Sequence, residues 1–429
     1  SARSVRRGPG PSRDVERRVG TGRPRGLHRP RARRAVATGL DELVAAGPHA
    51  AGLRDGARVG LVLHAASVDR LARHAVDLLG ATARFVPVRL FAPEHGHRGE
   101  AQDMEAIPET SDPDSGLPVV SLYGRSASSL RPRPEHLEGL DAIVWDLQDV
   151  GSRYYTFVHT LSHVMEAAAA SRRPVVVLDR PNPIGGLAVE GPVLDPALAS
   201  FVGRFPVPVR HGMTAGELAR LFHGAFGIDC DLRVVPMRGY RRWMHFEDTG
   251  LPWVAPSPNM PSVATARVYP GGCLVEGTNL SEGRGTTRPF ELTGAPWLDG
   301  RGLASALASE KLPGALFRAT SFRPTFHKHA GESCGGVQVH VSDRETFRPF
   351  AVYLVLLREA RSLAPGSFDW RREPYEFESS RLAIDLLLGL PGLREALEQG
   401  EELRAMEASW LPRLREFESL RRRFLLYPS

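Results

Sequence analysis

Short apolar runs alternate with amphipathic stretches through the first half of the chain. Residues 143–145 and 175–178 are continuous apolar runs, as expected of strands that are covered on both faces of a sheet. The pattern predicts strands at 58–64, 84–90, 118–122, 142–147 and 174–179, and helices at 68–79, 155–170 and 214–226. Alternating strands and helices favour a parallel sheet with right-handed crossovers, so residues 35–264 are predicted to form a Rossmann-like α/β domain.

The pattern changes after Pro256. Residues 256–296 are rich in Gly, Pro, Asn, Ser and Thr, which predicts a long loop of the kind that is usually functional or disordered. Alternation at 337–341 predicts a strand, and helices are expected near 344–362 and within 380–420. We therefore expect residues 265–429 to form a smaller C-terminal α/β domain.

The basic charge is concentrated in the first 34 residues. The whole chain of 429 residues carries a net charge of +6, but residues 1–34 contain twelve Arg against Asp14 and Glu16, a net +10 that leaves −4 for the rest. This Arg-rich tail has almost no large apolar side chains, so it is predicted to be disordered. A polybasic arm for nucleic acid or membrane is the alternative, but the tail lacks the aromatic residues and amphipathic period of such arms, so no nucleic-acid partner is expected.

Hydropathy bears on localisation. The chain has no run of eighteen apolar residues, so no membrane span is predicted. No apolar segment follows the N-terminal arginines as it would in a secretory signal, which favours the cytoplasm. Export stays open if the natural N-terminus differs from this one.

Polar and charged residues follow several of the predicted strands. Glu94 and His95 come directly after the second strand and Pro93, while Asp149 and Asp179 come at or just beyond the ends of the fourth and fifth strands. In an open α/β sheet, ligands bind beyond the carboxyl ends of the strands. Acids, amides, hydroxyls and arginines together suit a polyhydroxylated, acidic ligand better than an apolar one.

Several familiar chemistries are excluded by the motifs. The glycines at 283 and 285 do not extend to a dinucleotide fingerprint, because Arg288 occupies the last position, and no Walker sequence occurs. The pairs His95/His97 and His327/His329 have a spacing that is found in some metallohydrolases, but neither an HExxH helix nor a cysteine set accompanies them. We therefore predict no metal and no cofactor.

Seven blocks of sequence resemble one protein family in order and spacing. They read LFAPEHGHRG, SLYGR, DLQDVGSRYYTF, VLDRPNPIGG with VEGP, HGMTAGELA, APSPNMP and EGTNLSEGRGTTRPFE. The family is the DUF1343 group, whose characterised members are exo-β-N-acetylmuramidases. The resemblance implies a Rossmann-like domain, a smaller C-terminal domain and an active site in a cleft that involves both. It also implies removal of non-reducing-terminal N-acetylmuramic acid from peptidoglycan fragments, with Glu94 as the family's proposed catalytic acid.

That substrate gives the remaining candidates their roles. Glycoside hydrolysis ordinarily needs a protonated carboxyl and a second group, for which Asp149 and Asp179 are the candidates, followed by Glu282. The lactyl carboxylate of muramic acid calls for an arginine, and Arg153, Arg180 and Arg284 are available. The further substrate-binding candidates are His95, Gln148, Tyr155, Asn182, His211, Asn259, Asn279 and Glu282.

Two other functions stay open at this point. A non-catalytic protein could bind cell-wall glycans in the same cleft, and a metal-dependent deacetylase or esterase could use the histidines. The sequence leaves open the oligomeric state and whether hydrolysis would retain or invert the configuration at the sugar.

Overall fold

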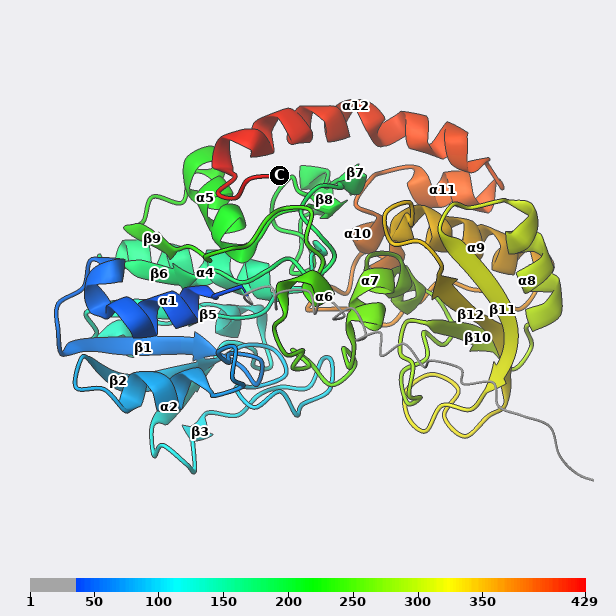
Figure 1. The fold of residues 1–429 in the computed structure, drawn as a ribbon. Helices are drawn as coiled ribbons and strands as arrows, with labels where there is room; N and C mark the ends of the chain where they lie inside the picture. Colours follow the sequence, from blue (N-terminus) through cyan, green and yellow to red (C-terminus); the bar gives the residue numbers. More distant parts are fainter. Residues whose placement is uncertain (1–35) are drawn as a thin grey trace, which may run out of the picture. The chain divides into compact units, whose positions relative to one another are not determined.

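The computed structural model of the protein describes residues 36–429. The disorder predicted for residues 1–34 lies outside the described part of the chain. The described part is a mixed α/β fold with a large, mostly parallel sheet and a smaller second domain that contains an antiparallel sheet, as the sequence predicts (Figure 1).

The large sheet has the strand order β3-β4-β2-β1-β5-β6-β9. All neighbouring strands are parallel except β3, which pairs antiparallel with β4. The strands are β1 (Ala57–Leu63), β2 (Phe85–Ala92), β3 (Thr110–Ser111), β4 (Pro118–Ser121), β5 (Ala142–Asp146), β6 (Val175–Leu178) and β9 (Leu232–Val235). The order reverses between β1 and β5, which places a crevice at their carboxyl ends.

Alternate residues of the central strands pack on opposite faces of the sheet. Val144 and Val176 lie in a core cluster with α1 (Gly39–Ala46) and α2 (Ala75–Gly80). Trp145 lies in the larger core with α4 (Phe157–Ala170) and α5 (Ala215–Phe226). Both faces of the sheet are therefore covered, which explains the continuous apolar runs of β5 and β6. A capping box between Thr214 and Glu217 begins α5, within the helix predicted at 214–226.

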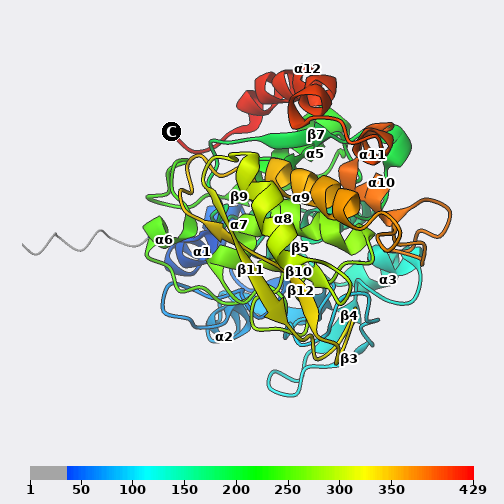
Figure 2. The same ribbon diagram turned by 90° about the vertical axis from the view of Figure 1, so that its right-hand side faces the viewer.

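The smaller sheet has the order β10-β12-β11 and is antiparallel. Its strands are β10 (Leu292–Ala295), β11 (Ala315–Phe322) and β12 (Cys334–Val341), and its main helices are α7 (Val263–Gly272), α8 (Gly300–Ser309) and α9 (Pro349–Leu363). Figure 2 looks onto this sheet with α8 and α9 beside it.

The remaining elements connect or cover the two sheets. They are the short helices α3 (Pro134–Leu137), α6 (Phe246–Thr249), α10 (Ala383–Leu388) and α11 (Leu393–Glu398), the hairpin of β7 (Glu190–Val193) and β8 (Pro208–Arg210), and α12 (Leu403–Arg421). The long helix α12 runs beside both halves of the fold (Figure 1).

Two predictions of local structure were wrong. The helix expected at 68–79 begins only at Ala75, because the Asp69 carboxylate accepts the backbone N–H groups of Leu71 and Arg73 at 2.9 and 2.8 Å and holds these residues in a turn. The loop expected at 256–296 contains α7, which begins where the Ser262 hydroxyl accepts the N–H of Thr265, and also contains β10.

Candidate active site

Glu94 is placed by a sharp turn at the end of β2. His95 and Gly96 both have positive φ, 68° and 81°, and the Nδ1 atom of His95 lies 2.9 Å from the carbonyl oxygen of Ala101. The turn points the Glu94 carboxyl toward the start of α4, where the Thr156 hydroxyl donates to its Oε2 at 2.5 Å. The Nε2 atom of His95 lies 3.9 Å from the other carboxyl oxygen. Glu94 is only 5% exposed, so few water molecules can reach it.

A cavity opens beside Glu94 and takes its walls from both halves of the fold. We call it the Glu94 cavity. Its lining combines acids, aromatic rings and amide or hydroxyl groups, and comprises Glu94, His95, Asp103, Tyr154, Tyr155, Thr156, Phe157, Val202, Ser257, Asn259, Met260, Tyr269, Glu276, Arg284, Phe290, Tyr375 and Glu376. Aromatic rings beside hydrogen-bonding groups are what a sugar ring requires.

One wall of the cavity is a network of paired charges around Arg284. Its guanidinium lies 2.7 Å from Glu276, 3.1 Å from Glu282 and 3.2 Å from Asp103, and 4.9 Å from the centre of the Phe290 ring. Burial alone would lower the pKa of Arg284, but the surrounding carboxylates raise that pKa well above its usual value. Arg284 therefore stays charged, and its carboxylate partners are compensated.

Glu282 stands behind this wall. Its carboxylate contacts Lys328 at 3.0 Å and His327 at 3.1 Å in addition to Arg284. Burial would raise the pKa of Glu282, but these cationic partners bring it well below its usual value. Glu282 does not line the cavity, and its ion pair with Arg284 holds the guanidinium in place from behind the wall.

A second carboxyl without a cationic partner lines the cavity. Glu376 is 6% exposed, and its Oε2 accepts a hydrogen bond from the Tyr123 hydroxyl at 2.8 Å. Burial, and next the charge of Glu94, hold the pKa of Glu376 well above its usual range. The neighbouring Tyr375 donates its hydroxyl to Glu276 at 2.7 Å, which ties this segment to the Arg284 network.

The structure brings five of the candidates from sequence analysis to the cavity wall. They are Glu94, His95, Tyr155, Asn259 and Arg284. Asn259 donates its side-chain amide to Gln102 at 2.9 Å, so its orientation is fixed.

Another group of candidates lies away from the lining, in the segments that follow β5, β6 and β8. The Asp149 carboxylate accepts the N–H of Gly151 at 2.8 Å and lies 3.4 Å from the Nε2 atom of His211. Gln148 donates its amide to the carbonyl oxygens of Asp149 and Pro181, and Asn182 donates to that of Met213. These contacts shape the loops, and none of the four side chains reaches the cavity lining.

The remaining charged candidates near β5 and β6 are buried with fixed partners. Asp179 is fully buried and accepts from Thr214, Gly216 and Tyr427. Arg180 binds Asp146 through two hydrogen bonds of 2.6 and 2.7 Å. Arg153 is also fully buried and donates to the carbonyl oxygen of Leu387 at 2.5 Å, at the end of α10. Asp179, Arg180 and Arg153 are thus placed as parts of the framework.

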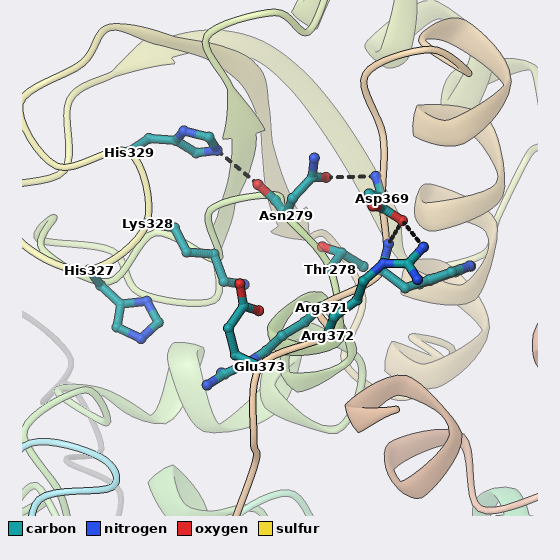
Figure 3. A pocket seen from close by; sticks show the side chains of 10 residues that line it. Thr278, Asn279, His327, Lys328, His329, Asp369, Arg371, Arg372 and Glu373 are labelled. Carbon is teal, nitrogen blue, oxygen red and sulfur yellow. Dashed lines mark hydrogen bonds and ion pairs between the residues drawn. The ribbon is translucent and has the colours of Figure 1, made fainter. Parts of the chain in front are cut away.

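Asn279 lies in a second, more open pocket (Figure 3). Its amide donates to the carbonyl oxygen of Ser367 at 2.7 Å and accepts from the N–H of Asp369 at 3.1 Å. This pocket adjoins the Glu94 cavity, because the guanidinium of Arg371 in its wall lies 5.3 Å from the ring of Tyr375.

Sequence reasoning missed Asp103, Tyr375 and Glu376. Nothing in their local sequence marks a site, because the stretch Pro374–Ser379 around Glu376 contains neither a glycine nor a strand signal. Glu276, Thr156 and Ser257 lie inside the blocks that resemble the family, but sequence reasoning assigned them no role.

The two histidine pairs are not arranged around a metal. His97 lies 3.1 Å from Asp112, outside the cavity, and His329 lies 2.8 Å from the carbonyl oxygen of Asn279. Within residues 36–429, no group of three or more His, Cys, Asp or Glu side chains is placed to hold a metal ion. None of the helices within residues 36–429 has the length and apolar character that crossing a membrane requires.

Fold and site together define a class of protein. A parallel sheet covered on both faces and a smaller second domain together line a cavity that holds two buried carboxyls, Glu94 and Glu376, a lining that fits the class of hydrolytic enzymes with acid–base chemistry.

Known proteins narrow that class to one family. Residues 59–264 match the profile described as exo-β-N-acetylmuramidase NamZ, N-terminal, and residues 267–427 match the corresponding C-terminal profile. The chain is 44% identical over 392 residues to the peptidoglycan β-N-acetylmuramidase NamZ of Bacillus subtilis (strain 168), with 91% of each chain covered. The protein belongs to the NamZ family of exo-β-N-acetylmuramidases, as the sequence resemblance predicts.

Solved structures agree with this assignment. A DUF1343 family protein from Bacteroides fragilis NCTC 9343 superposes with a TM-score of 0.83 at 33% identity, covering 92% of this chain and 100% of that one. A second DUF1343 family protein from the same strain superposes with a TM-score of 0.71 at 28% identity, covering 92% and 99%.

Proposed function

We propose that this protein hydrolyses the β-glycosidic bond of a non-reducing-terminal N-acetylmuramic acid in peptidoglycan fragments and releases the sugar. The observation that carries the proposal is the position of Glu94, a buried carboxyl at the end of β2 that lines a cavity rich in aromatic and hydrogen-bonding groups. The 44% identity to a peptidoglycan β-N-acetylmuramidase supports the same substrate.

Glu94 is proposed as a catalytic carboxyl of this reaction. The sequence also offered Asp149 and Asp179 for the second role. Asp179 accepts three or more hydrogen bonds from fixed donors and Asp149 bonds its own loop, and neither lines the cavity, so we do not assign them to the chemistry.

Arg284 is proposed to bind the lactyl carboxylate that distinguishes muramic acid from glucosamine. Of the three candidate arginines it alone lines the cavity, while Arg153 and Arg180 donate to buried framework groups. Tyr155 and Asn259 supply polar groups for the hydroxyl and N-acetyl substituents.

The test is turnover. The purified protein is incubated with the disaccharide of N-acetylmuramic acid β-linked to N-acetylglucosamine, and the released sugars are identified by mass spectrometry. We expect free N-acetylmuramic acid from the wild type and at least about a hundredfold less from Glu94→Gln, because a catalytic carboxyl contributes rate factors of that order or more. Glu100→Gln, an exposed glutamate of the same loop, is the matched control and should keep full activity.

Two results would contradict the proposal. Tight binding of the disaccharide without bond cleavage would make the protein a glycan-binding module. Loss of the acetyl group with the glycosidic bond intact, abolished by a chelator, would make it a metal-dependent deacetylase.

A further inference from the structure

Glu376 is held in a backbone conformation that its residue type disfavours. The N–H of Tyr375 donates to the carbonyl oxygen of Glu378 at 2.8 Å and the reverse bond measures 2.9 Å, so Glu376 and Phe377 form a two-residue turn. Both have positive φ, 49° and 66°. Such turns favour Asn-Gly, because side chains other than Gly, Asn and Asp are strained there. Backbone strain of this kind clusters at functional sites.

The same turn is anchored to the end of β4 by side chains. The Phe377 ring lies 5.3 Å from the ring of Tyr123 and 5.9 Å from that of Phe201, and Tyr123 and Phe201 are themselves 5.9 Å apart. The Tyr123 hydroxyl donates to the Glu376 carboxyl. This aromatic cluster fixes a side chain from the C-terminal half against the large sheet, in the cavity that Glu94 also lines.

The charges around Glu376 separate two kinds of carboxyl in this cavity. Glu276 and Asp103 are paired with Arg284. Among residues 36–429, neither Glu94 nor Glu376 lies within ion-pair distance of an Arg or Lys side chain. The charged groups that raise the pKa of Glu376 are Glu94, Glu276 and Asp103, while Arg284 of the same cavity is paired with the last two. Glu376 also lines a separate pocket in which Arg204 and Arg381 are paired with Glu166 and Glu378. Two buried carboxyls that repel each other are most stable when they hold one proton between them.

The two carboxyls are equally buried but differ in their partners. The Glu94 carboxylate has the Thr156 hydroxyl and, 3.9 Å away, the Nε2 atom of His95. Within the described part of the chain, Glu376 has the Tyr123 hydroxyl alone, which favours Glu376 as the residue that holds this proton. We propose that Glu376 is the general acid of the hydrolysis and that Glu94 is the ionised carboxylate that acts with it. The inference rests on the proposed function and adds to it the identity of the proton donor. It replaces the role of acid that the sequence resemblance implied for Glu94.

The proposed step balances as follows. The Glu376 O–H bond breaks and its proton passes to the glycosidic oxygen, which keeps the electron pair of the breaking C1–O bond and leaves as an alcohol. The negative charge of Glu94 stabilises the positive charge that develops at C1. The water that completes hydrolysis gives its hydroxyl group to C1 and its proton to the carboxyl pair, which restores the single proton.

The experiment compares leaving groups in three variants of the full chain. The substrates are the natural disaccharide, whose leaving oxygen needs a proton, and a dinitrophenyl β-N-acetylmuramide, whose leaving oxygen does not. For Glu376→Gln we expect a loss of about a hundredfold or more on the disaccharide but less than about tenfold on the dinitrophenyl substrate. Glu94→Gln should lose activity on both. Glu416→Gln, an exposed glutamate of α12, is the control and should lose neither.

Other outcomes overturn the inference. Equal losses of Glu376→Gln on both substrates, no loss on either, or rescue of Glu94→Gln by the dinitrophenyl group would each remove Glu376 from the role of acid while leaving the wild-type activity in place. A wild type that cleaves no muramide would overturn the proposed function, and the inference with it.

An infrared measurement of the free protein gives a readout that does not depend on turnover. We expect a band of a protonated carboxyl at neutral pH in the wild type that is missing in Glu376→Gln. In Glu94→Gln the band should persist with a lower titration midpoint, because the negative charge of Glu94 raises the pKa of Glu376. A band that Glu376→Gln leaves intact would contradict the assignment.

Discussion

Two groups of buried acids lie near the carboxyl edge of the same sheet and differ in their partners. The framework cluster, which we define as Asp146, Asp179 and Arg180, has a fixed donor for nearly every oxygen, including the bidentate contact of Arg180 with Asp146. The cavity pair, Glu94 and Glu376, has one hydroxyl donor for each carboxyl, from Thr156 and Tyr123.

The difference separates structural acids from reactive ones. Asp179 and Glu376 are similarly buried, and burial raises the pKa of both. The oxygens of Asp179 are committed to side chains and backbone groups that fold with it, whereas the cavity pair keeps oxygen atoms available to a substrate. Position at a strand end is therefore a weak criterion for catalysis, and the number of committed donors is a stronger one.

The largest effect that tests this comparison is expected from Arg180→Met. The substitution leaves the Asp146 carboxylate buried without its cation, which should lower the free energy of unfolding by about 3–5 kcal/mol. Urea denaturation measures this. The double variant Asp146→Leu/Arg180→Met, which buries no charge there, should recover most of the loss. If the Arg180→Met protein had normal stability but had selectively lost muramide cleavage, Arg180 would instead be a substrate-binding residue.

The pH dependence of stability gives the next effect. Burial raises the pKa of Asp179 to about 6, and the folded state therefore binds this proton more tightly than the unfolded state does. The resulting stabilisation is present in full below the unfolded pKa, near pH 4, and is lost as the pH rises through about 6, by up to about 3 kcal/mol.

Tyr427→Phe sharpens that measurement. The Tyr427 hydroxyl lowers the pKa of Asp179, so removing it should raise this pKa and extend the loss of stability to higher pH. The cost of the substitution should accordingly grow from pH 4 to 7 in urea titrations. A cost that is independent of pH would show that Asp179 does not titrate in this range.

The smallest of the three effects is expected at the cavity wall. Arg284→Lys keeps the charge but loses the planar guanidinium fork. The activation free energy that kcat/KM reports for muramides should rise by about 1.5–2 kcal/mol, the lower part of the range for a hydrogen bond to a charged group. The lower part applies because three carboxylates already share the guanidinium. The matching glucosaminide, which lacks the lactyl group, should be spared. Arg288→Lys, on a half-exposed arginine of the same loop, is the control. Equal loss on both substrates would make Arg284 structural.

The large sheet could be predicted from the sequence because its strands are apolar on both faces. The predicted strand at 142–147 is β5 (Ala142–Asp146), and 174–179 contains β6 (Val175–Leu178). The hydrophobic pattern predicted a helix at 68–79 that is largely absent, because a local polar contact prevents it. The Asp69 carboxylate accepts the backbone N–H groups of Leu71 and Arg73, which a helix would need.

The candidate site was predictable only on the side that the sheet supplies. Glu94 follows a strand and a proline, and such a position can be recognised in a linear sequence. Glu376 reaches the cavity through a strained turn and an aromatic cluster that exist only after the C-terminal half has packed on the large sheet. The linear sequence therefore does not show that Glu376 lies beside Glu94 in the cavity.

The bond between Tyr427 and Asp179 has a consequence for the order in which the protein can be completed during synthesis. The two residues lie 248 positions apart, and Tyr427 also accepts the N–H of Met237, two residues after the end of β9. At a translation rate of about 5–20 residues per second, Tyr427 is synthesised roughly 12–50 seconds after Asp179, the carboxyl to which it donates. Until Tyr427 leaves the ribosome, the sheet can form its strands, but the buried Asp179 carboxyl lacks this donor.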